Sequence, residues 1–249
     1  MDLVIEDLDS VYIKVHCERS IAKELNQYFT FAVPNYQFTP AYKNKVWDGQ
    51  IRLFNLFTHT IYAGLLDYVV KFATDRNYTV QVPENKDGTY TEESVAKYVE
   101  EFIRPTAGGK RITAHDYQIK AITHALNKER TLLLCPTGSG KSLIIYCLSR
   151  FFLDKIKQDK RILIVVPTVG LVSQMYSDFE DYSKENKWSV SRHCYTISSG
   201  KEKDTHKRVV ISTWQSIYKM PKEFFDQFDM VIGDECHLFK AKSLSSLMS

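Results

Sequence analysis

The chain has 249 residues, of which 44% are hydrophobic and 25% are charged, which is ordinary for a globular protein of one large or two modest domains. The formal net charge of +3 permits nucleic-acid binding but does not argue for it. Five scattered cysteines without a C-x-x-C pair argue against a disulfide framework or a zinc site and favour a reducing cytosol. The acidic N-terminus has no signal-peptide core, and no apolar run reaches the ~20 residues of a membrane helix. We therefore expect no targeting signal and no membrane partner.

Residues 1–83 predict a small α+β domain. Apolar periodicity predicts strands over 11–15 and 78–82, and helices over 21–29 and 65–76, with Ser20 as the cap of the first helix. Asp48-Gly49 between 45–47 and 50–54 is a strong signal for a hairpin turn.

Basic and aromatic residues interleave around this predicted hairpin, as they do where a surface grips phosphates and stacks bases. The candidates for nucleic-acid contact are Lys43, Lys45, Trp47 and Arg52. The alternative is that the aromatics fill a small core and the lysines are solvated. It has support, because the first 90 residues carry 9 Lys/Arg against 11 Asp/Glu.

Residues 84–112 predict a connector between two domains. We expect a turn-rich break over 84–88, a helix over 91–104 and a loop over 105–109.

From residue 113 onward, the pattern predicts an α/β domain with a mostly parallel sheet. A capping box over 113–116 opens a helix. Apolar strands are predicted over 132–135, 161–166, 208–212 and 230–233, and helices over 142–153, 170–182 and 221–228. Ligands of such sheets bind at the carboxyl ends of the strands.

The run from Thr131 to Ser142 reads TLLLCPTGSGKS, which is an apolar segment, a glycine-containing loop and the start of a helix. That order predicts a phosphate-binding loop, in which Lys141 reaches the β- and γ-phosphates and Ser142 offers its hydroxyl to Mg²⁺. The predicted ATP-binding residues of this loop are Pro136, Thr137, Gly138, Ser139, Gly140, Lys141 and Ser142. Cys135 stands where the full pattern has glycine, and the alternative is an ordinary Gly-Ser turn.

Asp234 and Glu235 follow the apolar run 230–233. A carboxylate at a strand end beside a phosphate loop can hold Mg²⁺, and its neighbour can deprotonate the attacking water. We therefore predict Lys141, Asp234 and Glu235 as catalytic residues, with Ser142 and Asp234 as the magnesium ligands. Cys236 and His237 are discounted as a metal site, because no other ligand cluster accompanies them.

Together these motifs resemble the first motor domain of superfamily 2 helicases of the DExH type. The resemblance implies a RecA-like P-loop fold, ATP and Mg²⁺ as cofactors, and an adenine-reading role for Gln118. His115 and Asp116 depart from the family there, because an Arg is often found at this point. The nucleic-acid contacts implied by the resemblance are Pro167, Thr168, Gln174, Thr213 and Gln215.

The stretch NKVWDGQIRL, residues 44–53, resembles recombination helicases of T4-like bacteriophages. The resemblance implies a monomeric, ATP-dependent DNA helicase that acts on branched DNA or R-loops in the host cytoplasm during phage recombination, replication and repair. Because the family motor has two lobes, we expect the chain alone to bind ATP weakly and to hydrolyse it poorly. The alternatives are an RNA helicase, the motor subunit of a restriction enzyme, and a non-catalytic DNA-binding module.

Overall fold

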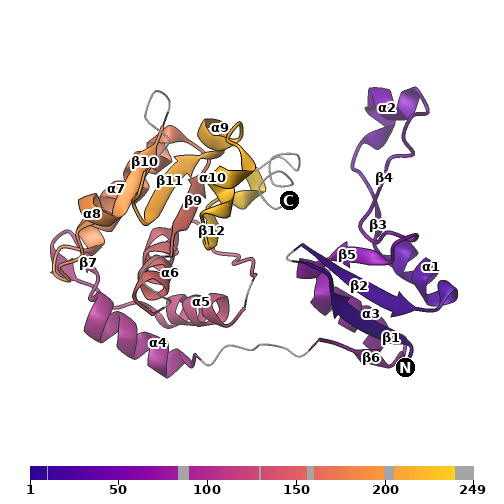
Figure 1. The fold of residues 1–249 in the computed structure, drawn as a ribbon, viewed down its shortest axis with the longest axis horizontal. Coiled ribbons are helices and arrows are strands. Elements are labelled where there is room, and N and C mark those ends of the chain that lie inside the picture. The colour runs from indigo at the N-terminus through magenta and orange to yellow at the C-terminus, as the bar shows by residue number, and fades with distance from the viewer. Residues whose placement is uncertain (10, 84–89, 129, 156–159, 199–204, 239–249) are drawn as a thin grey trace. The chain divides into compact units, whose positions relative to one another are not determined.

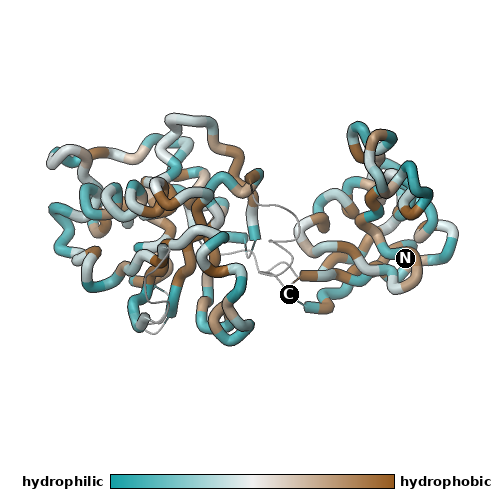
Figure 2. The backbone as a smooth tube through the Cα atoms, turned by 90° about the horizontal axis from the view of Figure 1, so that it is seen from above, coloured by the Kyte–Doolittle hydropathy of each residue, from teal (hydrophilic) through white to brown (hydrophobic). Residues whose placement is uncertain are grey.

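The computed structural model describes residues 1–9, 11–83, 90–128, 130–155, 160–198 and 205–238. The chain divides into two compact units, Met1–Lys86 and Asp87–Ser249, called unit 1 and unit 2 (Figure 1). Hydrophobic stretches run through the interior of each unit (Figure 2). Among the described helices, none is long and apolar enough to cross a membrane.

Unit 1 is built on a four-stranded sheet in the order β5-β2-β1-β6. Its strands are β1 (Leu3–Asp7), β2 (Tyr12–Cys17), β5 (Thr60–Tyr62) and β6 (Val80–Gln81). β1 is antiparallel to β2 and parallel to β6. The predicted strand over 11–15 is therefore confirmed, and the one over 78–82 is shorter. β1 was missed, because its two inward residues, Leu3 and Ile5, are too few to show a period among acidic neighbours.

Two helices cover one face of this sheet. They are α1 (Arg19–Tyr28) and α3 (Leu66–Asp75), the latter preceded by the 3₁₀ turn η2 (Ala63–Leu65). Leu25 and Phe72 are fully buried against inward residues of the strands. The predicted cap at Ser20 is wrong, because the helix begins at Arg19 after Glu18 and includes Ser20.

A hairpin arm, residues 30–52, extends from unit 1 (Figure 1). It contains β3 (Thr30–Ala32), η1 (Tyr36–Phe38), α2 (Pro40–Lys43) and β4 (Gln50–Arg52). β4 pairs with β3, so the predicted pairing with residues 45–47 is wrong. The reason is local: the Thr39 hydroxyl caps α2, and Pro40 begins it, so the chain before Asp48 is helix and turn.

Gly49 is nevertheless the turn glycine that the sequence predicts. Its φ is +79°, and a Cβ there would collide with the ring of Tyr36.

Unit 2 contains a four-stranded sheet in the order β10-β11-β9-β12. The strands, all parallel, are β9 (Ile162–Val166), β10 (Cys194–Ile197), β11 (Val209–Thr213) and β12 (Met230–Gly233). Three predicted strands, over 161–166, 208–212 and 230–233, are confirmed. β10 was missed, because two of its four residues are only partly buried and the pattern is weak.

Helices cover both faces of this sheet, as the two-sided apolar strands predict. The first face packs against α4 (Glu92–Tyr98), the π-helical turn η3 (Val99–Ile103), α5 (Asp116–Asn127), α6 (Lys141–Lys155), α7 (Val169–Tyr182) and α8 (Val190–His193). The second packs against α9 (Trp214–Ile217) and α10 (Lys222–Asp226). η4 (Cys236–Leu238) follows β12.

The predicted strand over 132–135 is wrong. In the described structure this segment pairs with no strand, and Leu132 and Leu134 are 66% and 88% exposed. An apolar run forms a strand only where a neighbouring strand offers its hydrogen-bonding edge, and the sequence pattern does not report that edge.

Two further expectations near the predicted connector are corrected. The expected loop over 105–109 is a small hairpin of β7 (Thr106–Ala107) and β8 (Lys110–Arg111). The capping box lies two residues further along than predicted: His115 caps α5, and its N–H donates to Gln118 Oε1 at 2.9 Å.

The predicted helix over 91–104 is confirmed as α4 and η3, and Arg104 ends it in the left-handed conformation. Val95 and Ile103 are fully buried in the core of unit 2. The break over 84–88 and a helix expected from residue 240 lie outside the described residues. The division into 1–83, 84–112 and 113–249 stays a prediction.

Asp229 aligns β12 beside β9. Its carboxylate accepts hydrogen bonds from Lys160 Nζ and from the Arg161 N–H, and its own N–H donates to the Arg161 carbonyl at 3.0 Å. Burial raises the pKa of Asp229, but the hydrogen bonds outweigh it, so the pKa lies below the ordinary 3.8.

We predict that Asp229→Asn lowers the free energy of unfolding at neutral pH by about 1 kcal/mol. Because the folded pKa is the lower one, this stabilisation is present above the unfolded value and is lost as pH falls through the folded value. Urea unfolding from pH 7 downward measures the difference. Asp226→Asn, at an exposed residue of α10, is the control. A difference that stays constant to the lowest pH contradicts the prediction.

Candidate nucleotide site and nucleic-acid surfaces

The predicted phosphate loop is a tight turn that runs directly into α6. The Ser139 N–H donates to the Pro136 carbonyl at 3.2 Å, and the Gly140 carbonyl accepts from the Leu143 N–H at 3.0 Å. Gly138 and Gly140 have φ values of +81° and +74°, which favour glycine. Ser139 is 9% exposed, and within the described residues its hydroxyl has no hydrogen-bond partner. The predicted loop is thus a tight glycine-containing turn at the start of α6, and phosphate binding stays a prediction.

Lys141 and Glu235 form an ion pair that joins this loop to the end of β12. Lys141 Nζ donates to Glu235 Oε1, across 94 positions of sequence. The pairing raises the pKa of Lys141 and lowers the pKa of Glu235. The second carboxylate oxygen of Glu235 lies 3.3 Å from His237 Nδ1. The structure therefore brings together two of the three predicted catalytic residues.

Asp234, the third predicted catalytic residue, is anchored by its backbone. Its N–H donates to the Val165 carbonyl of β9 at 2.9 Å, and its Oδ1 accepts from the Glu235 N–H at 3.0 Å. Burial and the neighbouring Glu235 charge raise the pKa of Asp234, and Lys141 opposes them. A half-buried carboxylate that is costly to ionise suits a cation.

The fit of Mg²⁺ depends on the donor set. The described residues contain no group of three or more His, Cys, Asp or Glu side chains that could hold a metal. Mg²⁺ binds in many proteins through one or two carboxylates together with substrate phosphates, and Asp234 beside the loop fits that mode. Ser142 is half-buried in the first turn of α6. Its role as a ligand stays a prediction.

Gln118 lies against the loop, and it is only 3% exposed. Its Nε2 donates to the Ser139 carbonyl at 2.9 Å, while its Oε1 accepts from the His115 N–H. Both halves of the amide are engaged within the protein, and adenine reading stays a prediction. The sequence analysis missed Tyr117, whose hydroxyl donates to the same carbonyl at 3.1 Å. Its position directly before Gln118 was the available signal.

The predicted nucleic-acid contacts of unit 2 follow β9 and β11. These strands are neighbours, so Pro167-Thr168 and Thr213 lie at the same edge of the sheet. The Thr168 hydroxyl accepts from the Leu171 N–H at 3.3 Å, and Thr213 is 2% exposed with its hydroxyl 2.9 Å from that of Ser216. Gln174 and Gln215 are exposed. The four positions other than Thr213 are at least partly accessible, and all five contacts stay predictions.

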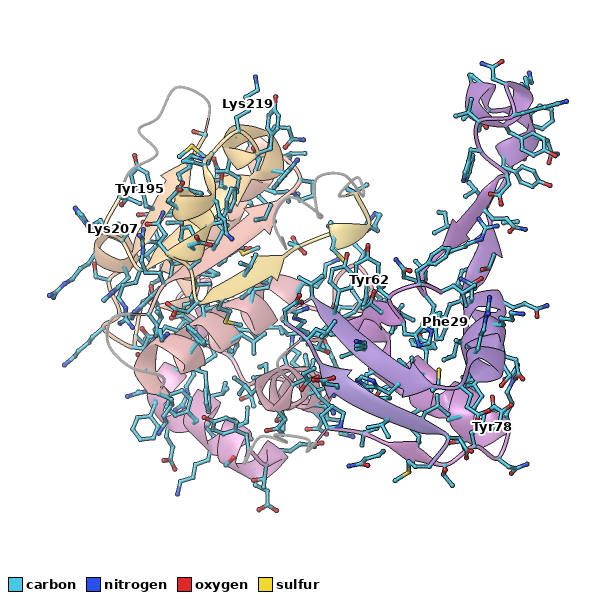
Figure 3. All side chains as sticks on the ribbon, turned by 45° about the vertical axis from the view of Figure 1, so that its right-hand side comes forward. Phe29, Tyr62, Tyr78, Tyr195, Lys207 and Lys219 are labelled. Carbon is cyan, nitrogen blue, oxygen red and sulfur yellow. The ribbon has the colours of Figure 1, made fainter. Side chains whose placement is uncertain are left out.

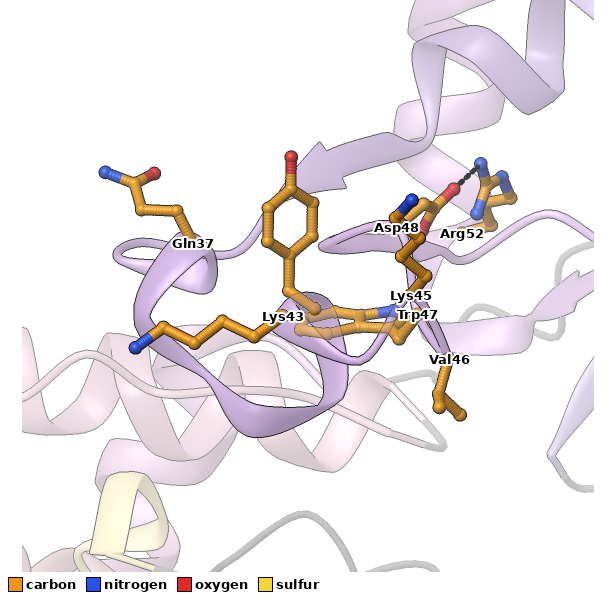
Figure 4. A pocket seen from close by; sticks show the side chains of 8 residues that line it. Gln37, Lys43, Lys45, Val46, Trp47, Asp48 and Arg52 are labelled. Atoms are coloured by element: carbon orange, nitrogen blue, oxygen red, sulfur yellow. Dashed lines mark hydrogen bonds and ion pairs between the residues drawn. The ribbon is translucent and has the colours of Figure 1, made fainter.

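The arm carries the predicted contacts of unit 1 around a hollow of about 770 Å³ (Figure 4). Its lining residues are Gln37, Tyr42, Lys43, Lys45, Val46, Trp47, Asp48 and Arg52. Arg52 donates to Asp48 and to Gln50 Oε1, and Trp47 Nε1 donates to the Gln50 carbonyl at 2.9 Å. Within the described residues, Lys43 and Lys45 form no ion pair.

Comparisons with known proteins agree with this geometry. Residues 2–83 match the family model described as the N-terminal domain of the DNA helicase UvsW, and residues 111–249 match that of the res subunit of type III restriction enzymes. A crystal structure of the UvsW helicase from bacteriophage T4 has a TM-score of 0.85 and 33% identity, covering 100% of this chain and 87% of that one. The chain belongs to the UvsW helicase family. The predicted RecA-like fold behind a small α+β domain is confirmed.

Other relatives show how much of the family length is present. The ATP-dependent DNA helicase uvsW of Enterobacteria phage T4 is 35% identical over 257 residues, which is 100% of this chain and 49% of the relative. A second T4 UvsW crystal structure gives a TM-score of 0.86 at 33% identity, with 50% of that chain covered. The DNA 3'-5' translocase XPB2 of Sulfurisphaera tokodaii is 27% identical over 135 residues, which is 54% of this chain and 27% of the relative. The chain thus spans about half the length of its curated UvsW relative.

We predict that Gly140→Ala distorts the loop for two separable reasons. A positive φ costs alanine ~1–2 kcal/mol, and the new Cβ collides with the Gln118 amide. We expect a lower melting temperature and weaker binding of a fluorescent ATP analogue.

Gly108→Ala is the control, because its φ is +58° and a Cβ there meets open space. The double variant with Gln118→Ala should recover the collision part of the loss but not the φ part. Equal losses in Gly140→Ala and Gly108→Ala, without coupling to Gln118, would contradict this account.

Proposed function

We propose that this chain supplies the phosphate half of the ATP site and the first nucleic-acid surfaces of an ATP-dependent DNA helicase. The observation that carries the proposal is the contact of Lys141 with Glu235, which joins the phosphate loop to the acidic strand end. A motor that hydrolyses ATP needs a cation for the phosphates, a carboxylate for Mg²⁺ and a base for water, and these three groups meet here.

In this mechanism Lys141 changes partner. In the structure its charge is balanced by Glu235, and the contact keeps it protonated. The γ-phosphate is the stronger partner for an ammonium group, so nucleotide binding draws Lys141 away. Glu235 is then free to accept a proton from the attacking water, and Asp234 would supply a carboxylate ligand to Mg²⁺. Bound Mg²⁺ neutralises charge on the β- and γ-phosphates.

The proposed substrates are branched DNA and R-loops, acted on by a monomer in the host cytoplasm during phage recombination, replication and repair. The support is membership of the UvsW family and the arm, where Lys43 and Lys45 have no acidic partner among the described residues. A restriction-enzyme motor is a second candidate, because residues 111–249 match that family model. DNA-stimulated ATP turnover compared on forked DNA, duplex DNA and RNA separates these and the RNA-helicase alternative.

We predict that Lys141→Ala abolishes ATP turnover in a form of the protein that carries both motor lobes, and leaves DNA affinity within about twofold. The ammonium group acts on phosphates of the nucleotide, not on those of DNA. Lys120→Ala, an exposed lysine of α5, is the control. We expect this chain alone to hydrolyse ATP poorly. If it binds DNA without hydrolysing ATP, it acts as a non-catalytic DNA-binding module. Loss of DNA binding with Lys141→Ala would show that its phosphate role is misassigned.

We predict that replacing Lys43, Lys45 and Arg52 together by alanine flattens the salt dependence of DNA binding. Each phosphate contact that is lost removes about 0.9 from the slope of log K against log salt. Lys43 and Lys45 should account for most of the change, because Arg52 is held by Asp48. The matched control replaces Arg19, Lys23 and Lys71, which are exposed on α1 and α3. An unchanged slope would mean that these three residues contact no DNA phosphate and are ordinary solvated surface residues.

A further inference from the structure

The sheet of unit 1 has a second face, away from α1 and α3, which we call the open face. Inward residues alternate with residues of this face along every strand, because successive side chains of a strand point to opposite sides. The core side takes Leu3, Ile5, Ile13, Val15 and Ile61. The open face takes Val4, Glu6, Tyr12, Lys14, His16, Thr60 and Tyr62.

Two tyrosines form a flat aromatic surface on this face. Tyr12 and Tyr62 are directly opposite each other on β2 and β5, with ring centroids 5.1 Å apart and planes inclined by 24°. A hydrogen bond between the two side chains raises the pKa of Tyr12. The rings stay 38% and 43% exposed, although each stacks on the other. Tyr62 is labelled in Figure 3.

The acidic groups near this pair already have partners. Glu6 Oε2 lies 2.7 Å from His16 Nε2, and Asp9 Oδ1 accepts from the N–H groups of Val11 and Tyr12. Lys14 lies on the open face two residues from Tyr12, directly opposite Thr60 of β5 on one side and Glu6 of β1 on the other, whose carboxylate lies against His16. Within the described part of the chain it forms no ion pair. The open face therefore presents stacked aromatic rings beside an unpaired ammonium group.

We propose that the open face binds single-stranded nucleic acid. Bases stack on the Tyr12–Tyr62 surface, and Lys14 contacts a phosphate. Exposed rings beside a lysine are complementary to an unpaired, anionic strand. A duplex is a poorer fit, since its bases are already stacked and its backbone needs rows of cations, whereas the strand residues of this face include one lysine, Lys14. The inference rests on the proposed DNA helicase function and adds a single-strand site separate from the arm.

The test is binding of a fluorescein-labelled oligo-dT to the chain, followed by anisotropy. Tyr12→Ala with Tyr62→Ala should weaken binding about tenfold, since base–aromatic stacking is the main attraction. Tyr12→Phe with Tyr62→Phe should retain affinity within about twofold, because the rings remain. Lys14→Ala should reduce the slope of log K against log salt by about 0.7, the value of one phosphate contact with a single strand.

Two controls sit on the helical side of the same unit. Tyr68→Ala removes a tyrosine of α3 that is 57% exposed, and Lys71→Ala removes an exposed lysine of the same helix. Both should leave oligo-dT binding unchanged. Equal losses in the control and open-face variants would overturn the proposal, as would full affinity of the double alanine variant or an equal loss of duplex binding.

Photocrosslinking covers the case in which the double alanine variant fails to fold. The unaltered chain is irradiated with oligo-dT that contains 5-iodouracil, and crosslinked peptides are identified by mass spectrometry. Crosslinks at Tyr12 or Tyr62 support the site, and crosslinks confined to other residues overturn it. The proposed function fails separately, by absence of DNA-stimulated ATP turnover in the two-lobed form. Failure at the tyrosines alone leaves that function intact.

Discussion

The pairing of Lys141 with Glu235 is the contact on which the nucleotide site depends. It joins the first residue of α6 to the second residue after β12, 94 positions later in the sequence. The two side chains are 27% and 30% exposed, so the pair contributes little to stability by itself. Its importance is geometric, since it brings the cation of the predicted phosphate loop next to the acidic strand end.

The parallel sheet makes that contact possible. β12 runs beside β9, so Asp234 follows β12 at the same sheet edge where Pro167 follows β9. Register is fixed at both ends of β12: Asp229 bonds to Arg161 at its start, and Asp234 bonds to Val165 at its finish. A slip of one residue would turn Asp234 to the other face. The short strand is therefore held where its chemistry requires it.

What the sequence predicted well was local structure that depends on a few neighbouring residues. In the loop from Pro136 to Ser142, Gly138 and Gly140 have φ values of +81° and +74°, which favour glycine. Both glycines can be read directly from the sequence. Pairing between distant segments was less accessible. The run 132–135 has the composition of a strand but no partner among the described residues. β4 pairs with β3, with Thr30 opposite Arg52 and Ala32 opposite Gln50, across an arm that local turn signals did not reveal. Gln118 was predicted as a site residue, but its bond to the Ser139 carbonyl depends on a fold that joins α5 to the loop.

Unit 1 shows how a chain with a net charge of only +3 can favour an anionic partner locally. In the arm, Asp48 is paired with Arg52, and Lys43 and Lys45 are left without an acidic partner in the described structure. On the open face, Glu6 is paired with His16, and Lys14 is left in the same way. In both places the nearby carboxylate already has a side-chain partner, and a lysine beside exposed aromatic rings forms no ion pair among the described residues. Local pairing, more than overall charge, sets where a nucleic-acid strand finds a favourable surface.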